Sequence, residues 1–318
     1  MASVTHDSSA GGSTGAPGGG PAKAGRALPD KRALLQRVIS LREGSIIVVT
    51  VVTAIYFATN TSSFFTGTNF ETLLPYFAPF AILAAGEVFV MILGEIDLSI
   101  GAMYLFAPIL FYKLNTSIGL PLVPAVIVAL LVCMVVGAIN GFFVAVVGIN
   151  SFVTTLAMLF TFEGLALIVS HGTPVATPGA GLHSTTQNVT HVVNGHSITL
   201  TEHVNHISTF AKVFGGGTYS ELIWAVAIVV ILQVVLTFTR WGLYTVAIGS
   251  NKLGAAEAGV QVKLVMIRNY VLCALTAGLV GIFEAVRAAT VQPDPAGANE
   301  ILFLAVAAGV IGGTLLTG

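Results

Sequence analysis

Long apolar runs separated by short polar stretches dominate the sequence after its first forty residues. A helix crosses a bilayer with about 20 apolar residues, and eight runs approach that length. They lie roughly at 44–65, 73–94, 98–112, 122–147, 152–170, 222–239, 269–286 and 301–318. The pattern predicts an all-α, polytopic helical membrane protein with about eight spans. Because the last run reaches the final residue, we expect the chain to be cut short at its C-terminal end.

The first 43 residues follow a different pattern. Residues 1–30 are rich in Gly, Ser, Ala and Pro and lack the apolar core of a signal peptide, which predicts a disordered tail. Asp30–Glu43 interleaves Leu, Val and Ile with Lys and Arg, a pattern typical of a basic amphipathic helix on a membrane surface. We therefore divide the chain into residues 1–43, a disordered cytoplasmic tail plus this helix, and residues 44–318, the transmembrane domain.

The longest polar segment, residues 171–221, contains six of the seven histidines. Within it Val189–Leu200 alternates polar and apolar residues around Asn194-Gly195, which predicts a β-hairpin. Two histidine pairs raise the alternative of a metal site: His203 with His206, and His191 with His196. Neither pair is accompanied by cysteine or by a suitable set of carboxylates, so we favour a solvated polar loop without metal.

Composition agrees with the membrane assignment. Hydrophobic residues make up 55% of the chain and charged residues 8%, with a mean hydropathy of +0.91. Soluble domains carry about 25% charged residues, so an ordinary water-soluble fold is excluded. The net charge of −1, without a basic patch interleaved with aromatics, gives no sign of nucleic-acid binding. Cys133 and Cys273 both lie inside apolar runs and are interpreted as space-filling residues.

Basic residues predict the orientation. Six lie in the N-terminal tail and four in the polar connector 240–268, whereas only Lys113, Lys212 and Arg287 fall on the other side of the predicted spans. Ten against three places the N-terminus and the connector in the cytoplasm, because cytoplasmic loops carry the excess of Lys and Arg.

Charged groups inside predicted spans are costly and therefore candidate functional residues. Four qualify: Glu87, Glu163, Glu284 and Arg287. Glu284 and Arg287 are three residues apart, share a helix face and are expected to form a structural ion pair. Glu87 and Glu163 have no partner nearby in the sequence. They are protonated, face a water-filled path or pair with another helix.

The segment Gly94–Gly101 interrupts an apolar stretch with two acids and a serine. One interpretation is a tight cytoplasmic turn in which Asp97 or Ser99 caps the next helix. The other is a broken helix near a pathway or gate. The pathway or gate candidates are Glu95, Asp97, Ser99, Glu87 and Glu163.

The connector 240–268 holds four Lys or Arg against one acid, and Leu253–Gly259 within it is rich in small residues and compatible with a helix. A short helix between two spans is a shape that another protein can grip, so we expect a docking element. Its candidate residues are Gly249, Asn251, Ala255, Ala256 and Gly259. The sequence contains no phosphate-binding loop, no nucleophile–base order and no metal-ligand spacing. We expect no catalytic residues, no metal and no cofactor.

Small residues predict close helix packing. Gly137-Ala-Ile-Asn-Gly141 forms a small-xxx-small face, and Gly278 and Gly281 lie one turn apart. Asn140, beside the first pair, is placed to hydrogen-bond across such an interface.

Three blocks of sequence together resemble the ribose/xylose/galactose-type permeases of ABC transporters. Gly94–Gly101 resembles that family's "GGIDLSVG" signature, with Glu95 where the family usually has glycine. The others are Asn140–Val144 with Asn150–Leu156 and Gly172–Val175, resembling "NG…FIATL…G.P", and Gly249–Asn251 with Ala255-Ala256 and Gly259-Val260, resembling "GGNxxAAxxSGI". Gln292-Pro293 and Gly309–Gly318 extend the match, which covers about 40 to 318 in the family's order.

The resemblance implies a permease subunit in the plasma (inner) membrane of a bacterium, surrounded by lipid. It implies a homodimer that binds two ABC ATPase subunits through the 249–260 loop and receives a sugar from an extracytoplasmic substrate-binding protein. ATP hydrolysis then belongs to the partner, and family members continue beyond the position of Gly318.

The residues alone leave an alternative open. In an ion- or proton-coupled secondary transporter, Glu87, Glu163 or Asp97 would bind the coupling ion. An inverted repeat with a broken helix in each half would favour this function, and the sequence shows one obvious break.

Overall fold

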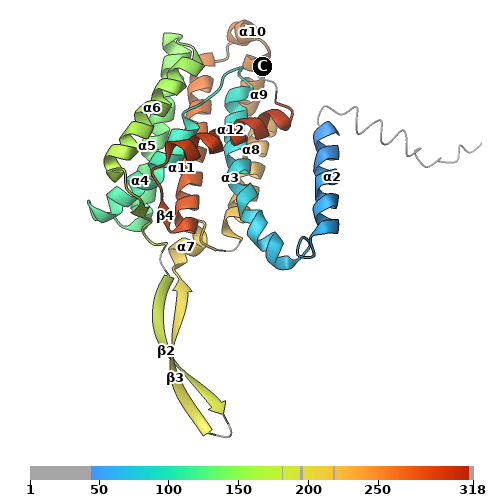
Figure 1. Cartoon of the computed structure of the whole chain (residues 1–318). Helices are drawn as coiled ribbons and strands as arrows, with labels where there is room; N and C mark the ends of the chain where they lie inside the picture. The colour runs from blue at the N-terminus through green and yellow to red at the C-terminus, as the bar shows by residue number, and fades with distance from the viewer. Residues whose placement is uncertain (1–43, 181, 194–195, 218, 315–318) are drawn as a thin grey trace, which may run out of the picture.

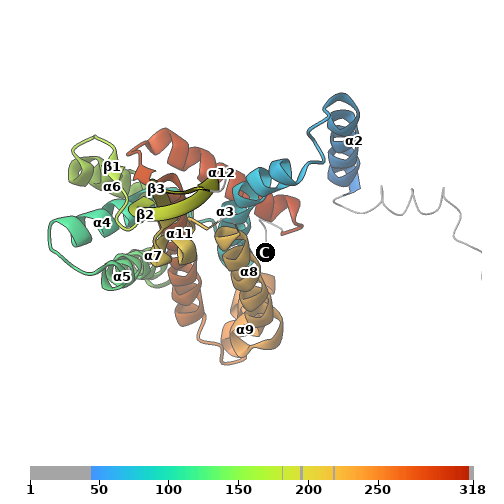
Figure 2. The ribbon, with the colours of Figure 1, turned by 90° about the horizontal axis from the view of Figure 1, so that it is seen from below.

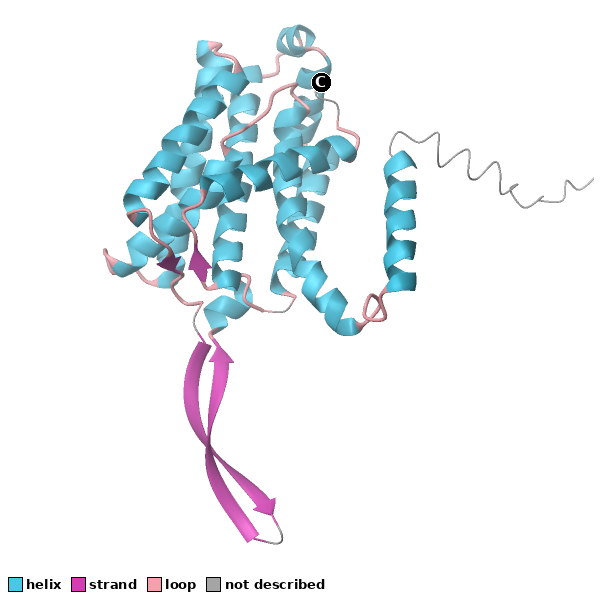
Figure 3. Cartoon of the chain, in the orientation of Figure 1, coloured by secondary structure: helices cyan, strands magenta, loops and turns pink. Residues whose placement is uncertain are grey.

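The computed structural model describes residues 44–180, 182–193, 196–217 and 219–314, and the expected tail and amphipathic helix lie outside them. Helices make up most of this part (Figure 3). They are α2 (Gly44–Asn60), α3 (Gly67–Met91), α4 (Ile100–Thr116), α5 (Leu122–Phe142) continued by the π-helical η1 (Phe143–Val147), α6 (Ser151–Ser170), α7 (Thr209–Val213), α8 (Ser220–Phe238), α9 (Arg240–Ser250), α10 (Lys252–Glu257), α11 (Val262–Ala288) and α12 (Pro295–Ile311). The strands are β1 (Val175–Ala176), β2 (Leu182–Val193), β3 (His196–Ile207) and β4 (Thr290–Val291).

The helices confirm the all-α polytopic architecture but not the count of about eight spans. In the described part, 5 helices are long and apolar enough to cross a membrane. They are α3, α5 with η1, α6, α8 and α11. Helix α12 and the described part of α2 are apolar but shorter, and α4 has 17 residues.

Helix α11 forms the centre of the bundle. It is packed against α3, α4 and α5, and most of its side chains from Val265 to Val286 are buried. Helix α10 lies at one end of the bundle and the β2–β3 hairpin projects from the other (Figure 1). We call these the α10 end and the hairpin end. Helix α2 stands apart from the bundle in both views, and nearly all its described side chains are exposed (Figures 1 and 2).

The contact between α5 and α11 depends on glycine. A Cβ atom added at Gly137 would lie 2.5 Å from the Tyr270 carbonyl oxygen, and one at Gly141 would lie 2.6 Å from the Ile267 Cα atom. At Gly278 it would lie 2.7 Å from the Cys133 sulfur atom. The small-residue pattern therefore marks a close helix contact within the chain, as glycines commonly do in membranes.

Two antiparallel strand pairs complete the fold. The hairpin prediction is confirmed in the described residues, since β2 pairs with β3 and Val193 lies opposite His196. Strand β1 pairs with β4 through Val175 and Val291, which joins the chain after α6 to the chain after α11.

Candidate functional site

The break between α3 and α4 is held by a buried polar network. Glu87 on α3 accepts a hydrogen bond from the Asp97 backbone N–H at 2.9 Å and another from the Cys273 thiol of α11 at 2.9 Å. Asp97 Oδ1 accepts from the Ser99 backbone N–H at 2.9 Å and from the Ser99 hydroxyl at 2.6 Å. Asn140 of α5 donates to the Ser99 hydroxyl at 2.8 Å. The network ties four helices together.

Its position distinguishes the two interpretations of this segment. The side chains of Glu87, Asp97, Ser99 and Asn140 are all completely buried. Ser99 occupies the N-cap position of α4 but makes no capping hydrogen bond through its side chain. The second half of the segment is therefore a break inside the bundle rather than a turn on its surface.

The two other acids proposed for a pathway lie outside this network. Glu95, two residues before Asp97 in the break, is half-buried. Glu163 on α6 is 6% exposed and lies against Asn299 of α12. The structure thus brings Glu87, Asp97 and Ser99 together and leaves Glu95 and Glu163 apart from them.

An ion cluster lies near the hairpin end of α11. Arg287 forms an ion pair with Glu284 on the same helix and a second one, at 3.3 Å, with Glu221 in the first turn of α8. The guanidinium also lies 4.9 Å from the centre of the Tyr76 ring of α3, within the range of a cation–π contact. One arginine therefore links α3, α8 and α11.

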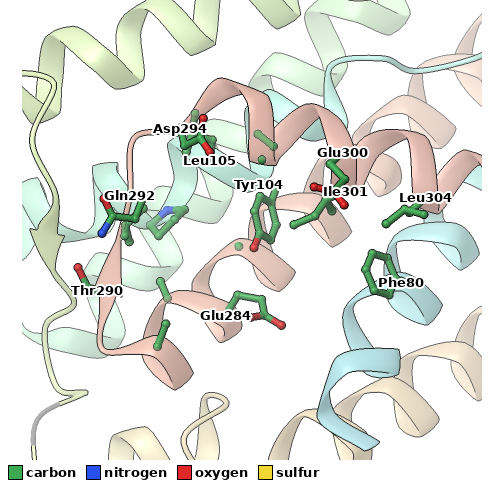
Figure 4. A pocket seen from close by; sticks show the side chains of 17 residues that line it. Phe80, Tyr104, Leu105, Glu284, Thr290, Gln292, Asp294, Glu300, Ile301 and Leu304 are labelled. Atoms are coloured by element: carbon green, nitrogen blue, oxygen red, sulfur yellow. The ribbon is translucent and has the colours of Figure 1, made fainter. Parts of the chain in front are cut away.

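A cavity of about 430 Å³ opens beside Glu284 (Figure 4). In the figure Tyr104 of α4 lies in the middle, between Gln292 and Thr290 on one side and Phe80 and Leu304 on the other. Asp294 and Glu300 border it from the β4–α12 segment. None of the 17 described residues that line the cavity is Lys, Arg or His.

Two residues at the start of α12 determine where this wall of the cavity begins. The Asp294 carboxylate accepts a hydrogen bond from the Ala296 backbone N–H at 3.0 Å, and Pro295 occupies the first helical position. Both residues favour the start of a helix at this point. The predicted span at 301–318 missed these signals, and with them Asp294 and Glu300 as residues of a site.

The predicted docking loop folds into α9, α10 and a glycine turn. Asn251 caps α10 by accepting from the Gly254 backbone N–H at 2.9 Å. Gly259, just after α10, has φ +84°, a backbone angle that favours glycine. Gly249 packs against the backbone of Ile92 at the end of α3.

The residues of α10 differ in how far their side chains are exposed. Leu253 is 78% exposed and Ala256 is exposed, whereas Ala255 is buried against Ile248 and Val265. The prediction that Ala255 lies on the docking surface is not met, because this side chain faces α9 and α11 and packs inside the protein. Leu253 is not among the predicted docking residues. As an apolar residue in a polar connector, it is a sequence signal for a contact surface.

Helix α9 is anchored to the bundle through Asn269 of α11. This completely buried side chain accepts from the Trp241 indole N–H at 2.7 Å and donates to the Phe89 carbonyl of α3 at 2.8 Å. No sequence pattern indicated this connection, because Asn269 is the first residue of the predicted span 269–286 and lies 28 residues from Trp241.

Comparisons with known proteins agree with this architecture. Residues 69–318 match the family model described as "Branched-chain amino acid transport system / permease component". The chain is 33% identical to the xylose/arabinose import permease protein of Sulfolobus acidocaldarius, over 88% of this chain and 72% of that protein. It is 29% identical to the ribose import permease protein of Escherichia coli K12, over 87% of this chain and 79% of that protein.

A third relative is the D-allose transport system permease protein of Escherichia coli K12, which is 26% identical over 86% of this chain and 76% of its own length. No solved structure matches the chain significantly. The matched region includes all five long apolar helices except the first two residues of α3. The chain therefore belongs to the ABC transporter permease family that includes the xylose/arabinose and ribose import permeases.

Proposed function

We propose that the chain is the membrane-spanning permease subunit of an ABC importer for a monosaccharide. A binding protein outside the membrane delivers the sugar, and separate ATPase subunits supply the energy. The family and its sugar-importing relatives support this function, and they disfavour an ion-coupled secondary transporter. In this proposal a second copy of the chain completes the pathway, and the α10 end faces the cytoplasm.

The observation that carries the proposal is the surface of α10. A helix of 6 residues stands at the end of the bundle with Leu253 directed outward and Ala255 fixing its other side to the protein. Leu253 and Ala256 are both exposed on this helix and provide an apolar contact for a second protein. We assign Leu253, Ala256 and the Gly259 turn to the contact with an ATPase subunit.

Co-purification tests this assignment. The tagged chain is expressed with its ATPase and binding protein, and both the bound ATPase and sugar uptake are measured. Leu253→Glu places a charge at the contact, and Gly259→Val puts a β-branched residue at positive φ. Each variant is expected to lower ATPase recovery and uptake roughly tenfold, equivalent to about 1.4 kcal/mol of binding free energy.

Two conservative variants serve as controls. Leu253→Met keeps the apolar contact, and Gly259→Asn suits the left-handed backbone angle. Both are expected to retain the ATPase and uptake. Retention of ATPase and uptake in Leu253→Glu and Gly259→Val, at normal membrane levels, would refute the docking assignment.

The contacts of Glu87 support a structural role in place of ion coupling. Both of its carboxyl oxygens already accept hydrogen bonds, from the Asp97 backbone and from Cys273. These two contacts hold the carboxyl group between the α3–α4 break and α11.

A further inference from the structure

We propose that the cavity between α3, α4, α11 and α12 is a binding site for a neutral polyhydroxylated solute on its way through the membrane. This inference rests on the proposed function and adds to it the position and chemistry of solute contact. It places solute contact beside Tyr104 and Gln292, which are not part of the buried network of Glu87, Asp97 and Ser99.

The first argument is the cost of polar groups at membrane depth. Helix α12 crosses the bundle between its two ends (Figure 1), and Gln292, Asp294 and Glu300 are all exposed there. Lipid cannot solvate a carboxylate or an amide, so such groups in membrane proteins face protein or water. The cavity wall therefore borders a water-containing space, which is the environment a solute pathway requires.

The second argument is the kind of polar group. Glu284, Asp294, Glu300 and the Gln292 amide all offer oxygen acceptors, and the Tyr104 hydroxyl both donates and accepts. Sugar hydroxyls are donors that match these acceptors. The rings of Phe80 and Tyr104 offer apolar surfaces for the C–H faces of a sugar ring.

The third argument is charge. The family description names branched-chain amino acids, whose carboxylate needs a cation or free backbone N–H groups. The described lining contains no Lys or Arg, and Asp294 already caps the start of α12. Arg287 pairs with the lining residue Glu284, but it is already neutralised by Glu284 and Glu221. Three lining carboxyl groups disfavour an anionic solute further. The volume of about 430 Å³ lies within the range of small-molecule sites, about 300–1,000 Å³.

Solute protection of a cysteine in the wall tests the proposal. Ala288 is exposed and lines the cavity, so Ala288→Cys reports on access to it, whereas the native Cys133 and Cys273 are completely buried. The permease–ATPase complex in nanodiscs is treated with a maleimide, with or without a mixture of xylose, ribose and allose. The mixture is expected to slow alkylation several-fold, and leucine or glycerol phosphate is not.

Matched variants place the effect in the cavity. Gln292→Ala or Tyr104→Phe in the Ala288→Cys background is expected to abolish protection. Gln233→Ala on the exposed face of α8 and Tyr112→Phe farther along α4 are expected to retain it, because neither residue lines the cavity. Ser117→Cys, an exposed cysteine outside the cavity, is expected to react equally with and without sugar.

The outcomes separate this inference from the function on which it rests. Absence of sugar protection in a complex that retains its ATPase and imports sugar overturns the solute site alone. Protection by leucine overturns the solute class. Slow alkylation regardless of solute overturns the proposal in favour of a contact between two permease copies. Loss of ATPase binding and uptake in the unaltered chain refutes the proposed function itself.

Discussion

At the scale of single residues, the structure turns a short sequence motif into a set of hydrogen bonds. Asp97 accepts two hydrogen bonds from Ser99, and its own backbone N–H donates to Glu87. Buried polar groups are tolerated when they are paired and expensive when one partner is removed. The motif therefore stabilises an irregular backbone within an apolar bundle.

Replacement of Asp97 tests this role. Asp97→Ala leaves the Ser99 N–H and hydroxyl without their acceptor and is expected to destabilise the protein by about 2–6 kcal/mol, at about 1–3 kcal/mol for each of these two unpaired groups. Asp97→Asn retains a side-chain oxygen and is expected to cost less. Thermal unfolding of the detergent-solubilised chain measures both. Equal unfolding temperatures for Asp97→Ala and the unaltered chain would contradict the assignment.

At the scale of elements, features that depend on nearby residues in the sequence were predicted well, and features that depend on contacts between distant segments were not. Apolar runs predicted α5 and α6 to within a few residues because span length is a local property. The start of α12 was missed because its signal was a capping motif ahead of the apolar run. The cavity was not predictable, since Tyr104, Glu284 and Gln292 meet only after α4, α11 and β4 pack together.

The α5–α11 contact gives a prediction with an internal control. Gly137→Ala puts a methyl group within 2.8 Å of the Ala274 Cβ atom and is expected to destabilise the protein by about 1–3 kcal/mol through overpacking. Gly164→Ala on α6 meets nothing within 4 Å, so only the gain of about 1 kcal/mol in helix propensity remains. Opposite shifts in unfolding temperature are expected. A higher unfolding temperature for Gly137→Ala would show that the helices are not this close.

At the scale of the whole molecule, charge and shape agree. Arg240, Lys252, Lys263 and Arg268 belong to α9, α10 and the start of α11, and α10 marks one end of the bundle (Figure 1). Lys212 of α7 lies toward the end from which the hairpin projects. The positive-inside rule therefore predicts a cytoplasmic α10 end and an external hairpin.

Cysteine labelling in intact cells tests this orientation. A membrane-impermeant maleimide is expected to react with Thr186→Cys in β2 and not with Ser250→Cys at the end of α9. Permeabilised cells provide the control, since both positions should then react. Labelling of Ser250→Cys alone in intact cells would reverse the topology.

Helix α8 joins the ion cluster around Arg287 to the α10 end of the bundle. Its first turn holds Glu221 against Arg287, and only Thr239 separates its last residue from α9. Its 19 residues form a stiff strut of roughly 28 Å, at about 1.5 Å per residue. Under the proposed function, a movement of α10 that is driven by nucleotide binding reaches Arg287 through α9 and α8.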